Sequence, residues 1–308
     1  MNTEKTIIIG SGPAGLTAGM YSARAQLQPL IFEGSTPGGQ LMGTTYVDNW
    51  PSIPHILGPE LMMQMKQQTH TLGARFAART ITRVDFSQDT FVLWDNKNTE
   101  YHAHSVIITT GATPKRLGCA GEDTYWGKGV TTCAVCDGAF YKNKPVVIVG
   151  GGDTAMENAS FMTNFTNDIT IIHILDTLTA SKAMQERVLN NPSIKIRYMN
   201  TVGSIEGNGT HVTGITLTNK VTGETSSVAT DAIFIAIGST PNTAPFKGHI
   251  ELDNYGYIVL KQFTQTSVKG VFAAGDVTDY RYRQAIASAG TGCMAALDAE
   301  RFLKENNR

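Results

Sequence analysis

The run Thr6-Ile7-Ile8-Ile9-Gly10-Ser11-Gly12-Pro13-Ala14-Gly15 determines the fold expected for this chain. Four consecutive β-branched residues are typical of a buried parallel strand, and the Gly-x-Gly-x-x-Gly pattern behind them is typical of a tight turn into a helix. The helix is predicted to run to about Ala25. A second strand is predicted over 29–32, directly before Glu33.

The same pattern occurs again later in the chain. An apolar strand over 146–149 precedes Gly150-Gly151-Gly152-Asp153-Thr154-Ala155, a helix is predicted through about Phe165, and a strand follows over 169–172. Each copy later closes with an apolar strand that leads into Gly-x-x-Pro, at Gly111–Pro114 and Gly238–Pro241. The sequence therefore predicts an α/β protein with two Rossmann-like dinucleotide-binding domains.

The two copies also indicate how the domains are arranged. The chain has 308 residues, which is enough for two domains. Segments rich in Pro, Gly and Thr lie near 115–118 and 242–248. Since a C-terminal segment of about 60 residues is too short for a good core of its own, we expect it to complete the first domain. The first domain is thus expected over 1–116 and 245–308, and the second, 117–244, is inserted into it.

The first glycine turn has the features of a complete dinucleotide site. Gly10 allows the tight turn, Gly12 lets a pyrophosphate approach the backbone, and Gly15 lets the helix pack closely on the strand. The start of the helix supplies free N–H groups to the phosphates. Glu33, 18 residues after Gly15, is where an acid accepts hydrogen bonds from the adenosine ribose.

The second turn lacks the acid. Gly150, Gly152 and Ala155 match the pattern, but the position that corresponds to Glu33 is His173, 21 residues after Gly152. Asp176 follows three residues later and is a candidate for the ribose. A 2′-phosphate requires Arg or Lys nearby, and no cation follows His173 until Lys182.

Cys133-Ala134-Val135-Cys136-Asp137 lies between the two turns and indicates redox chemistry. A Cys-x-x-Cys pair can close a small disulfide loop, and Asp137 can exchange the proton that thiol chemistry requires. A zinc site is not supported, because there is no second Cys pair and no His pair with ligand spacing. Cys119 and Cys293 are interpreted as small buried hydrophobic residues, and no metal site is expected.

Composition excludes other classes of function. With 41% hydrophobic residues, 17% charged residues and a net charge of −1, the chain has no electrostatic basis for binding nucleic acid or an anionic membrane. No apolar run approaches the roughly 20 residues of a membrane span. Four cysteines and an N-terminus that leads directly into a strand favour the reducing cytoplasm over secretion.

These motifs together resemble the low-molecular-weight bacterial thioredoxin reductases, a family of flavin disulfide reductases, over essentially the whole chain. The matching runs are Gly10–Gly15, Gly38–Leu41, Asp48–Pro51, Cys133–Gly138, Gly150–Ala155, Gly275–Val277, Arg283–Ala285 and Ala289–Cys293. Several independent motifs in the same order are more specific than any one of them.

The resemblance implies a cytoplasmic homodimer that binds FAD in the first domain and a nicotinamide nucleotide in the second. It assigns FAD to Gly10, Gly12, Pro13, Ala14, Gly15, Glu33, Gln40, Asn49, Gly111, Asp276, Arg283, Gln284 and Ala285. It assigns the nicotinamide nucleotide, if bound, to Gly150, Gly152, Asp153, Thr154, Ala155 and His173. Family members alternate between two domain orientations, for which the junctions near Pro114 and Pro241 are suitable hinges.

The implied mechanism runs from nicotinamide to a partner protein. Hydride reduces FAD, and the flavin passes two electrons to the Cys133–Cys136 disulfide by attack on Cys136. Asp137 protonates the departing thiolate, and the dithiol then reduces thioredoxin or a thioredoxin-like disulfide protein by thiol exchange.

The chain departs from the family at its adenosine-phosphate motif, His-Arg-Arg-x-x-x-Arg. His173 is present, but Ile174, Leu175 and Thr179 replace the three arginines. Each lost charge-assisted hydrogen bond is worth roughly 1.5–3 kcal/mol, so the preference for NADPH should fall steeply. The donor is then NADH with Asp176 on the ribose, NADPH held weakly through Lys182 or Arg187, or no nicotinamide nucleotide.

The third possibility leaves other functions open. Electrons can come from ferredoxin or another flavoprotein, as in some relatives of this family. A flavin-dependent dithiol oxidase would also keep FAD and Cys-x-x-Cys, and would transfer electrons to oxygen. A redox sensor, which binds a partner according to its dithiol state, is the alternative outside enzymes.

Overall fold

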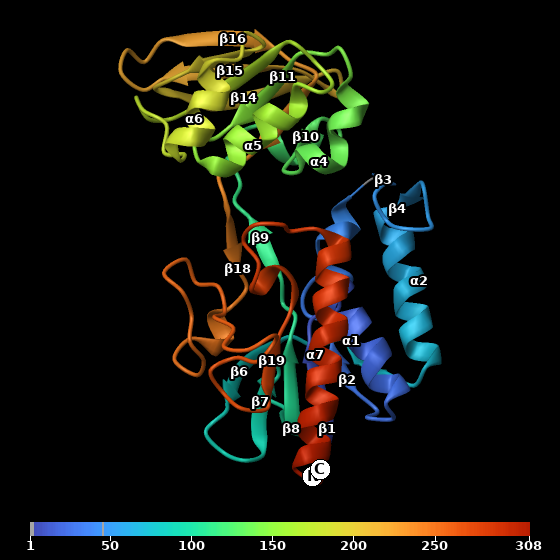
Figure 1. The fold of residues 1–308 in the computed structure, drawn as a ribbon. Coiled ribbons are helices and arrows are strands. Elements are labelled where there is room, and N and C mark those ends of the chain that lie inside the picture. Colours follow the sequence, from blue (N-terminus) through green and yellow to red (C-terminus); the bar gives the residue numbers. More distant parts are fainter. Residues whose placement is uncertain (1–2, 45) are drawn as a thin grey trace. The chain divides into compact units, whose positions relative to one another are not determined.

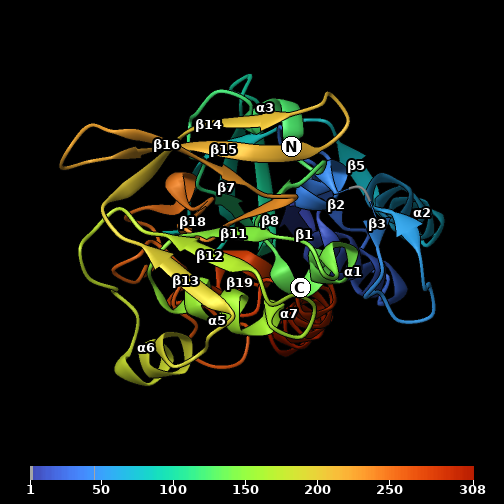
Figure 2. The ribbon, with the colours of Figure 1, turned by 90° about the horizontal axis from the view of Figure 1, so that it is seen from above.

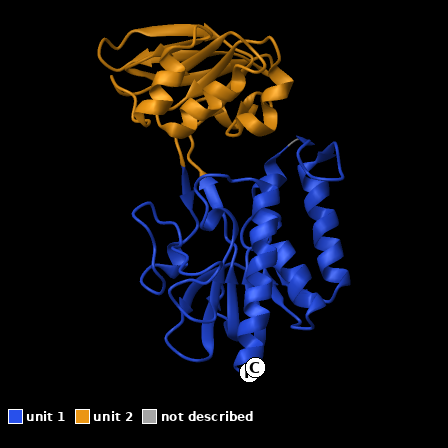
Figure 3. Ribbon diagram, in the orientation of Figure 1, with its two compact units in different colours: residues 1–113, 239–308 blue, residues 114–238 orange. Residues whose placement is uncertain are grey.

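A computed structural model describes residues 3–44 and 46–308 of the chain. The chain divides into two compact units: residues 1–113 with Ser239–Arg308, and Pro114–Gly238 (Figure 3). The chain crosses between the units at two short strands that pair with each other, β9 (Ala112–Pro114) and β18 (Ser239–Pro241). The boundaries expected at 116/117 and 244/245 lie three and six residues beyond these crossings.

Unit 1 contains a seven-stranded sheet in the order β5-β2-β1-β8-β7-β6, with β19 also paired to β8. Strands β5, β2, β1, β8 and β19 are parallel, while β6 and β7 are antiparallel additions. The strands are β1 (Thr3–Ile9), β2 (Leu30–Phe32), β5 (Arg75–Ala77), β6 (Ile81–Asp85), β7 (Phe91–Asp95), β8 (Glu100–Ile108) and β19 (Val271–Ala273). The C-terminal segment therefore contributes a strand beside β8.

The helices α1, α2 and α7 of unit 1 run alongside this sheet (Figure 1). Their bounds are α1 (Pro13–Arg24), α2 (Gly58–Thr71) and α7 (Ala285–Glu305). Successive residues of β1 face opposite sides: Ile8 packs with the alanines of α1 and α7, and Ile7 and Ile9 pack in a second core with β6 and β7. A Cβ on Gly292 of α7 would lie 2.2 Å from the carbonyl oxygen of Ala14, so the Gly-Thr-Gly-Cys run allows α7 to cross the start of α1 closely.

Short elements complete unit 1. They are η1 (Gly39–Gly43), the antiparallel pair β3 (Tyr46–Val47) and β4 (Ile56–Leu57), η3 (Ala244–Phe246) and η4 (Gly275–Val277). Met62 and Met65 of α2 pack with Leu16 of α1, so α2 is held against α1 by a small core of its own.

Unit 2 contains a five-stranded parallel sheet in the order β10-β17-β11-β12-β13. Figure 2 shows a three-stranded antiparallel sheet, β14-β15-β16, on one side of it and the helices α5 and α6 on the other. The strands are β10 (Val130–Thr131), β11 (Val146–Val149), β12 (Ile169–Ile172), β13 (Ile194–Arg197), β14 (Asn200–Gly207), β15 (Val212–Asn219), β16 (Thr225–Ala229) and β17 (Ala232–Ile235).

The central strands β11 and β17 of the parallel sheet are buried on both faces, as expected for a parallel sheet. Val147 and Val149 of β11 pack with the small antiparallel sheet, and Val146 and Ile148 pack with α5 and α6. The helices are α3 (Glu122–Tyr125), α4 (Ala134–Asp137), η2 (Gly138–Tyr141), α5 (Asp153–Met162) and α6 (Lys182–Leu189). The predicted α/β class with two Rossmann-like units is confirmed.

Some local expectations are refined by the model. Helix α5 ends at Met162 rather than near Phe165, because the N–H groups of Phe165 and Thr166 both turn back to the Met162 carbonyl. Cys119 and Cys293 are free thiols, as expected, but both are half-buried rather than buried. No helix in the part of the chain described here is long and apolar enough to cross a membrane.

Candidate active site

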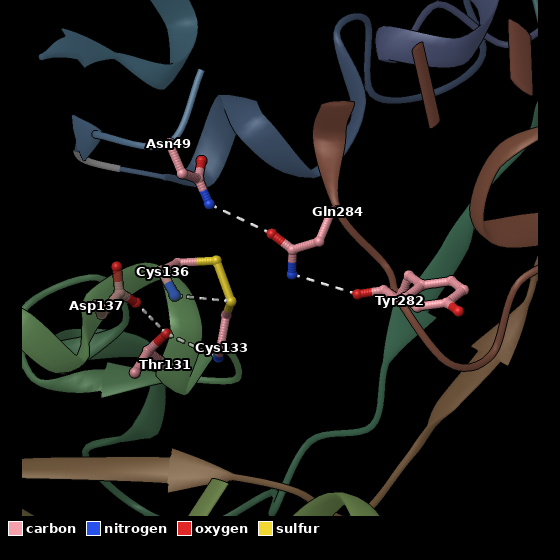
Figure 4. The surroundings of a disulfide bond; sticks show 7 residues. All are labelled: Asn49, Thr131, Cys133, Cys136, Asp137, Tyr282 and Gln284. Carbon is pink, nitrogen blue, oxygen red and sulfur yellow. Dashed lines mark hydrogen bonds between the residues drawn. A yellow bond between two sulfur atoms is a disulfide. The ribbon is translucent and has the colours of Figure 1, made fainter. Parts of the chain in front are cut away.

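Cys133 and Cys136 form a disulfide with a Cα–Cα separation of 5.3 Å (Figure 4). Cys133 is the N-cap of α4, and its Sγ accepts a hydrogen bond from the Cys136 N–H at 3.2 Å. A hydrogen bond to sulfur favours the charged form of a thiol, and free N–H groups at a helix start act in the same direction. The fold therefore stabilises a thiolate on Cys133 once the disulfide opens.

Asp137 lies one residue after the disulfide and is joined to it through Thr131. The Thr131 hydroxyl donates to the Asp137 carboxylate and accepts from the Cys133 N–H at 3.3 Å (Figure 4). This arrangement brings together the three predicted catalytic residues, Cys133, Cys136 and Asp137. Thr131 was not predicted from the sequence, where only its position two residues before Cys133 marks it.

Tyr141 is a second neighbour of Asp137 that the sequence did not indicate. Burial, with smaller effects from the Asp137 and Asp231 carboxylates, raises the pKa of Tyr141 to about 12. Its ring also packs edge-on against Phe234 at a centroid distance of 5.9 Å. The Tyr141 phenol is therefore neutral at physiological pH and adds no charge near the Asp137 carboxylate.

The first glycine turn connects β1 to α1 and is sterically demanding. Gly10 has a φ of +114°, and a Cβ there would lie 2.3 Å from the carbonyl oxygen of Thr109. A Cβ on Gly15 would lie 2.0 Å from the carbonyl oxygen of Gly10. Gly12 is different: a Cβ there would have no heavy atom within 4 Å. The turn is closed on the side of the sheet and open at Gly12, where a pyrophosphate would approach.

The start of α1 suits an anion. Gly12 is its N-cap, makes no side-chain capping bond, and is followed by Pro13 and Ala14. The first N–H groups of a helix have no partner within the helix, so they favour a phosphate at this end. The residues here fit the diphosphate of a dinucleotide such as FAD.

Glu33, the predicted ribose acid, is buried with 7% of its surface exposed. Its Oε1 pairs with Nζ of Lys66 on α2 at 2.5 Å. This ion pair fixes the Glu33 side chain at the end of β2. Lys66 was not singled out in the sequence because 33 residues separate it from Glu33.

The other residues assigned to FAD come together in unit 1 from distant parts of the chain. Gln40 Nε2 donates to Asp276 Oδ2 at 3.2 Å and to the Ala112 carbonyl at 2.8 Å. Asn49 Nδ2 donates to Gln284 Oε1 at 3.3 Å (Figure 4). Burial, helped by nearby Asp279, raises the pKa of Asp276, although the Ser288 hydroxyl and Gln40 donate to it. Asp276 is thus held in place by Gln40 and Ser288.

Three further residues assigned to FAD, Gly111, Arg283 and Ala285, are adjacent in sequence to Ala112 or Gln284. Gly111 has a φ of +67° and open space where its Cβ would be. Arg283 Nη1 donates to Ser239 Oγ at 3.0 Å, and Ala285 is the first residue of α7. The bond to Ser239 connects Arg283 to β18, where the chain returns to unit 1.

The second glycine turn connects β11 to α5 with the same backbone. Gly150 has a φ of +142°, and a Cβ there would lie 2.3 Å from the carbonyl oxygen of Ala236. Gly152 is the N-cap of α5 without a side-chain capping bond, Asp153 and Thr154 follow it, and Ala155 is fully buried. Asp153 Oδ1 accepts the N–H of Ser181 at 2.7 Å, which connects this turn to the segment before α6.

His173 is folded back onto the second turn. It is 5% exposed, its Nε2 lies 2.9 Å from the Thr177 carbonyl oxygen, and a Cβ on Gly151 would lie 2.2 Å from its ring. The Thr179 N–H donates to the Gly151 carbonyl at 2.8 Å. His173 and the segment after it therefore cover Gly151. The imidazole is held within its own loop by its hydrogen bond with the Thr177 carbonyl.

At the positions of the family arginines, Ile174 and Leu175 are each 45% exposed. The parallel pairing of β12 with β13 places the backbone of a different cationic residue, Arg197, beside this segment. Ile172 of β12 is in register with Arg197 of β13, and the His173 N–H donates to the Arg197 carbonyl at 2.9 Å. Arg197 lies 24 residues from His173 in sequence, so a search of the local motif does not find it.

Comparison with known proteins agrees with this geometry. Residues 4–292 match the family model described as pyridine nucleotide-disulphide oxidoreductase. The chain is 48% identical to a thioredoxin reductase of Streptomyces clavuligerus, covering 98% of this chain and 94% of that protein. It is 47% identical to a thioredoxin reductase of Dictyostelium discoideum, covering 98% and 99% of the two chains.

A solved structure of a thioredoxin reductase from Giardia duodenalis superposes with a TM-score of 0.95 and 42% identity, covering 99% of this chain and all of the other. A second one, from Streptococcus pyogenes, superposes with a TM-score of 0.92 and 36% identity over 97% of this chain and 98% of that chain. Membership of this family implies an FAD cofactor and a pyridine nucleotide donor. The chain belongs to the pyridine nucleotide-disulphide oxidoreductases and, within them, to the thioredoxin reductases.

Proposed function

We propose that this chain is a thioredoxin-disulfide reductase that passes electrons from a pyridine nucleotide through FAD to Cys133–Cys136 and on to thioredoxin. The observation that carries the proposal is the disulfide across the start of α4, with Asp137 joined to it through Thr131. A structural disulfide would need no carboxyl group and no thiolate-stabilising N–H at this position.

The residues of unit 1 are suited to hold FAD. The open backbone at Gly12 would bind the diphosphate, Glu33 the adenosine ribose, and the paired Gln40 and Asp276 the chain that links diphosphate to flavin. When bound, FAD supplies the means to take hydride from a nicotinamide and to release two electrons to a disulfide. The pair Asn49 and Gln284 would orient the ring system.

The Cys133–Cys136 pair and Asp137 perform the thiol chemistry. When the disulfide gains two electrons, the S–S bond breaks and Cys133 leaves as a thiolate stabilised by the Cys136 N–H. Asp137 supplies the proton that converts a thiolate to a thiol, and takes one back when the pair is oxidised. One sulfur of the dithiol then attacks the partner disulfide, and the second resolves the mixed disulfide, so the partner leaves as a dithiol.

The surroundings of the disulfide favour a protein partner. Val135 and Phe140 are 55% and 47% exposed on either side of Cys136. Exposed apolar side chains around a polar reactive group are typical of a protein-binding surface. We propose that they contact thioredoxin.

A stripe on α7 supports the homodimer. Ile286, Gly290, Met294 and Leu297 are exposed and follow one another at spacings of four, four and three residues along this helix. Such spacing places them on one face, and an exposed apolar face is typical of a subunit interface. We therefore propose that α7 faces a second copy of the chain, which sedimentation of Met294→Lys against the unchanged protein would test.

We propose that the pyridine nucleotide binds at Gly150–Ala155 and that this site accepts both NADPH and NADH. The turn keeps the backbone of a dinucleotide site, while Ile174, Leu175 and Thr179 provide no charge for a 2′-phosphate. Asp176, which is exposed three residues after His173, is available to a ribose hydroxyl.

The donor is tested by mixing FAD-loaded protein anaerobically with NADPH and, separately, with NADH while the visible flavin absorbance is followed. Bleaching by both nucleotides is the expected result. No bleaching by either, with dithionite-reduced protein still reducing thioredoxin, would move the donor to ferredoxin or another flavoprotein. Fast oxygen consumption with a small dithiol would instead indicate an oxidase.

The disulfide step is tested with Cys133→Ser and Cys136→Ser. Both variants should keep flavin bleaching by the nucleotide and lose thioredoxin reduction. Cys119→Ser is the matched control, since Cys119 is half-buried in unit 2 and forms no disulfide. Thioredoxin reduction by Cys136→Ser at the unchanged rate would contradict the proposed function.

A further inference from the structure

Arg197 lies in unit 2, outside the family's adenosine-phosphate motif that begins at His173. It is the last residue of β13 and exposed, and its register partner Ile172 is the residue before His173. The carboxyl ends of parallel strands meet at one edge of the sheet, which is where open α/β sheets bind ligands. Arg197 is therefore at the ligand edge, beside the segment that has lost the family arginines.

Arg197 is one of the residues that line a pocket of about 600 Å³. The lining residues come from one end of four strands, namely the end of β13, the starts of β14 and β16 and the end of β15. They are Arg197, Asn200, Asn219, Glu224, Thr225 and Ser226.

Backbone hydrogen bonds join the rim of this pocket to the segment after β12. The Asn200 N–H donates to the His173 carbonyl at 3.0 Å, and the Met199 N–H donates to the Leu175 carbonyl at 3.1 Å. The Lys220 N–H donates in turn to the Met199 carbonyl at 2.7 Å. The pocket and the adenosine end of the nucleotide turn are thus parts of one connected edge.

The chemistry of the pocket favours an anion with hydrogen-bonding oxygens. Within the described chain no carboxylate pairs with Arg197, and its Nη1 makes a long hydrogen bond of 3.5 Å to Ser226 Oγ. A guanidinium can bind a phosphate with two parallel hydrogen bonds, and Asn and Ser side chains can complete the shell. Glu224 opposes an anion and limits the affinity.

We propose that this pocket receives the 2′-phosphate of NADPH, with Arg197 as its cationic ligand. The inference rests on the proposed use of a pyridine nucleotide at Gly150–Ala155. It adds the reason why NADPH remains a substrate although Ile174, Leu175 and Thr179 are uncharged. Arg197 contacts the part of NADPH that NADH lacks, so it determines nucleotide preference rather than the chemistry.

The test compares two adenosine probes that need neither flavin nor nicotinamide. Adenosine 2′,5′-bisphosphate and adenosine 5′-monophosphate differ only in the 2′-phosphate, and their affinities for the FAD-loaded protein are measured by calorimetry. The unchanged protein should bind the bisphosphate about tenfold more tightly. Arg197→Gln should remove that difference without weakening the monophosphate.

Two further variants make the result specific. Lys195→Gln removes the same charge two residues earlier on β13, where Lys195 pairs with Asp168, and it should leave the ratio of affinities unchanged. Glu224→Gln should raise the affinity for the bisphosphate alone. Equal binding of both probes by the unchanged protein, or an equal effect of Arg197→Gln on both, would overturn the inference.

The outcomes separate this inference from the proposed donor. If the probes respond to Arg197→Gln as expected but neither NADPH nor NADH bleaches the flavin, the pocket binds a 2′-phosphate and the proposal of a pyridine nucleotide donor is wrong. If both nucleotides bleach the flavin and Arg197→Gln leaves the ratio of the two probe affinities unchanged, the proposed donor is correct and the proposed 2′-phosphate pocket is wrong. If neither probe binds and neither nucleotide bleaches the flavin, both fail.

Discussion

The two glycine turns have one backbone geometry but opposite surroundings at the ribose position. Both end a buried parallel strand with a left-handed glycine and begin a helix without a side-chain cap. In the first, the buried acid Glu33 at the end of β2 forms an ion pair with Lys66. In the second, His173 stands at the equivalent place, folded onto Gly151. The backbone therefore determines that a diphosphate fits, and the end of the second strand determines which dinucleotide is bound.

The turns also differ at the third position of the motif. A Cβ on Gly15 would lie 2.0 Å from the Gly10 carbonyl oxygen, whereas the second turn has a residue with a Cβ, Ala155, at the corresponding position. The first turn therefore tolerates less change.

The largest effect should come from exchanging these two residues. Gly15→Ala forces backbone atoms apart and should lower the free energy of unfolding by about 3 kcal/mol or more, with loss of FAD. Ala155→Gly should lower it by only about 1 kcal/mol, through helix propensity. Denaturant unfolding and flavin content measure both. Equal effects would show that the two turns do not differ in tightness.

The next effect concerns charge at the second ribose site. Leu175→Arg should restore one phosphate ligand and raise the affinity for NADPH about tenfold to a hundredfold, without changing that for NADH. Leu175→Gln has a side chain of similar length and no charge, so it serves as the control. The ratio of kcat/KM for the two nucleotides is the measurement, and an unchanged ratio for Leu175→Arg would place the adenosine elsewhere.

A smaller effect should follow from Asp153, which stands where the first turn has Pro13. Its carboxylate accepts from the Ser181 N–H but also puts a negative charge at the start of α5. Asp153→Asn keeps an acceptor and removes the charge, so KM for either nucleotide should fall by roughly threefold at low salt. High salt should cancel the gain, and a rise in KM would mean that the charge itself assists binding.

The smallest effect concerns the pH dependence of unit 1. Burial raises the pKa of Asp276, so the folded protein holds this proton more tightly than the unfolded chain does. Stability is then greatest below the unfolded pKa and falls as the pH rises toward the folded one. Asp276→Asn should remove this fall, so the stability of the FAD-free variant should no longer decrease as the pH rises. Thermal unfolding across pH, with Asp253→Asn as the control, measures it.

The sequence indicated much of the core because its signals are local. The strands β2, β11 and β12 and the glycine turns after β1 and β11 were predicted at nearly their observed positions, since each of these strands is a short apolar run. Strand β1 was predicted from Thr6 but begins at Thr3. The antiparallel sheet β14-β15-β16 was not predicted. Its strands are rich in Thr, Ser and Gly and are only partly buried, so their pattern does not differ clearly from that of a loop.

By itself, then, the sequence determined the class of fold, the redox pair and the loss of the family arginines, because each is written in adjacent residues. Only the tertiary structure decided which distant groups meet: Lys66 with Glu33, and Gln40 with Asp276. It also placed Arg197 beside His173. Parallel strands bring together residues that are separated by a whole helix, and no local pattern carries that register.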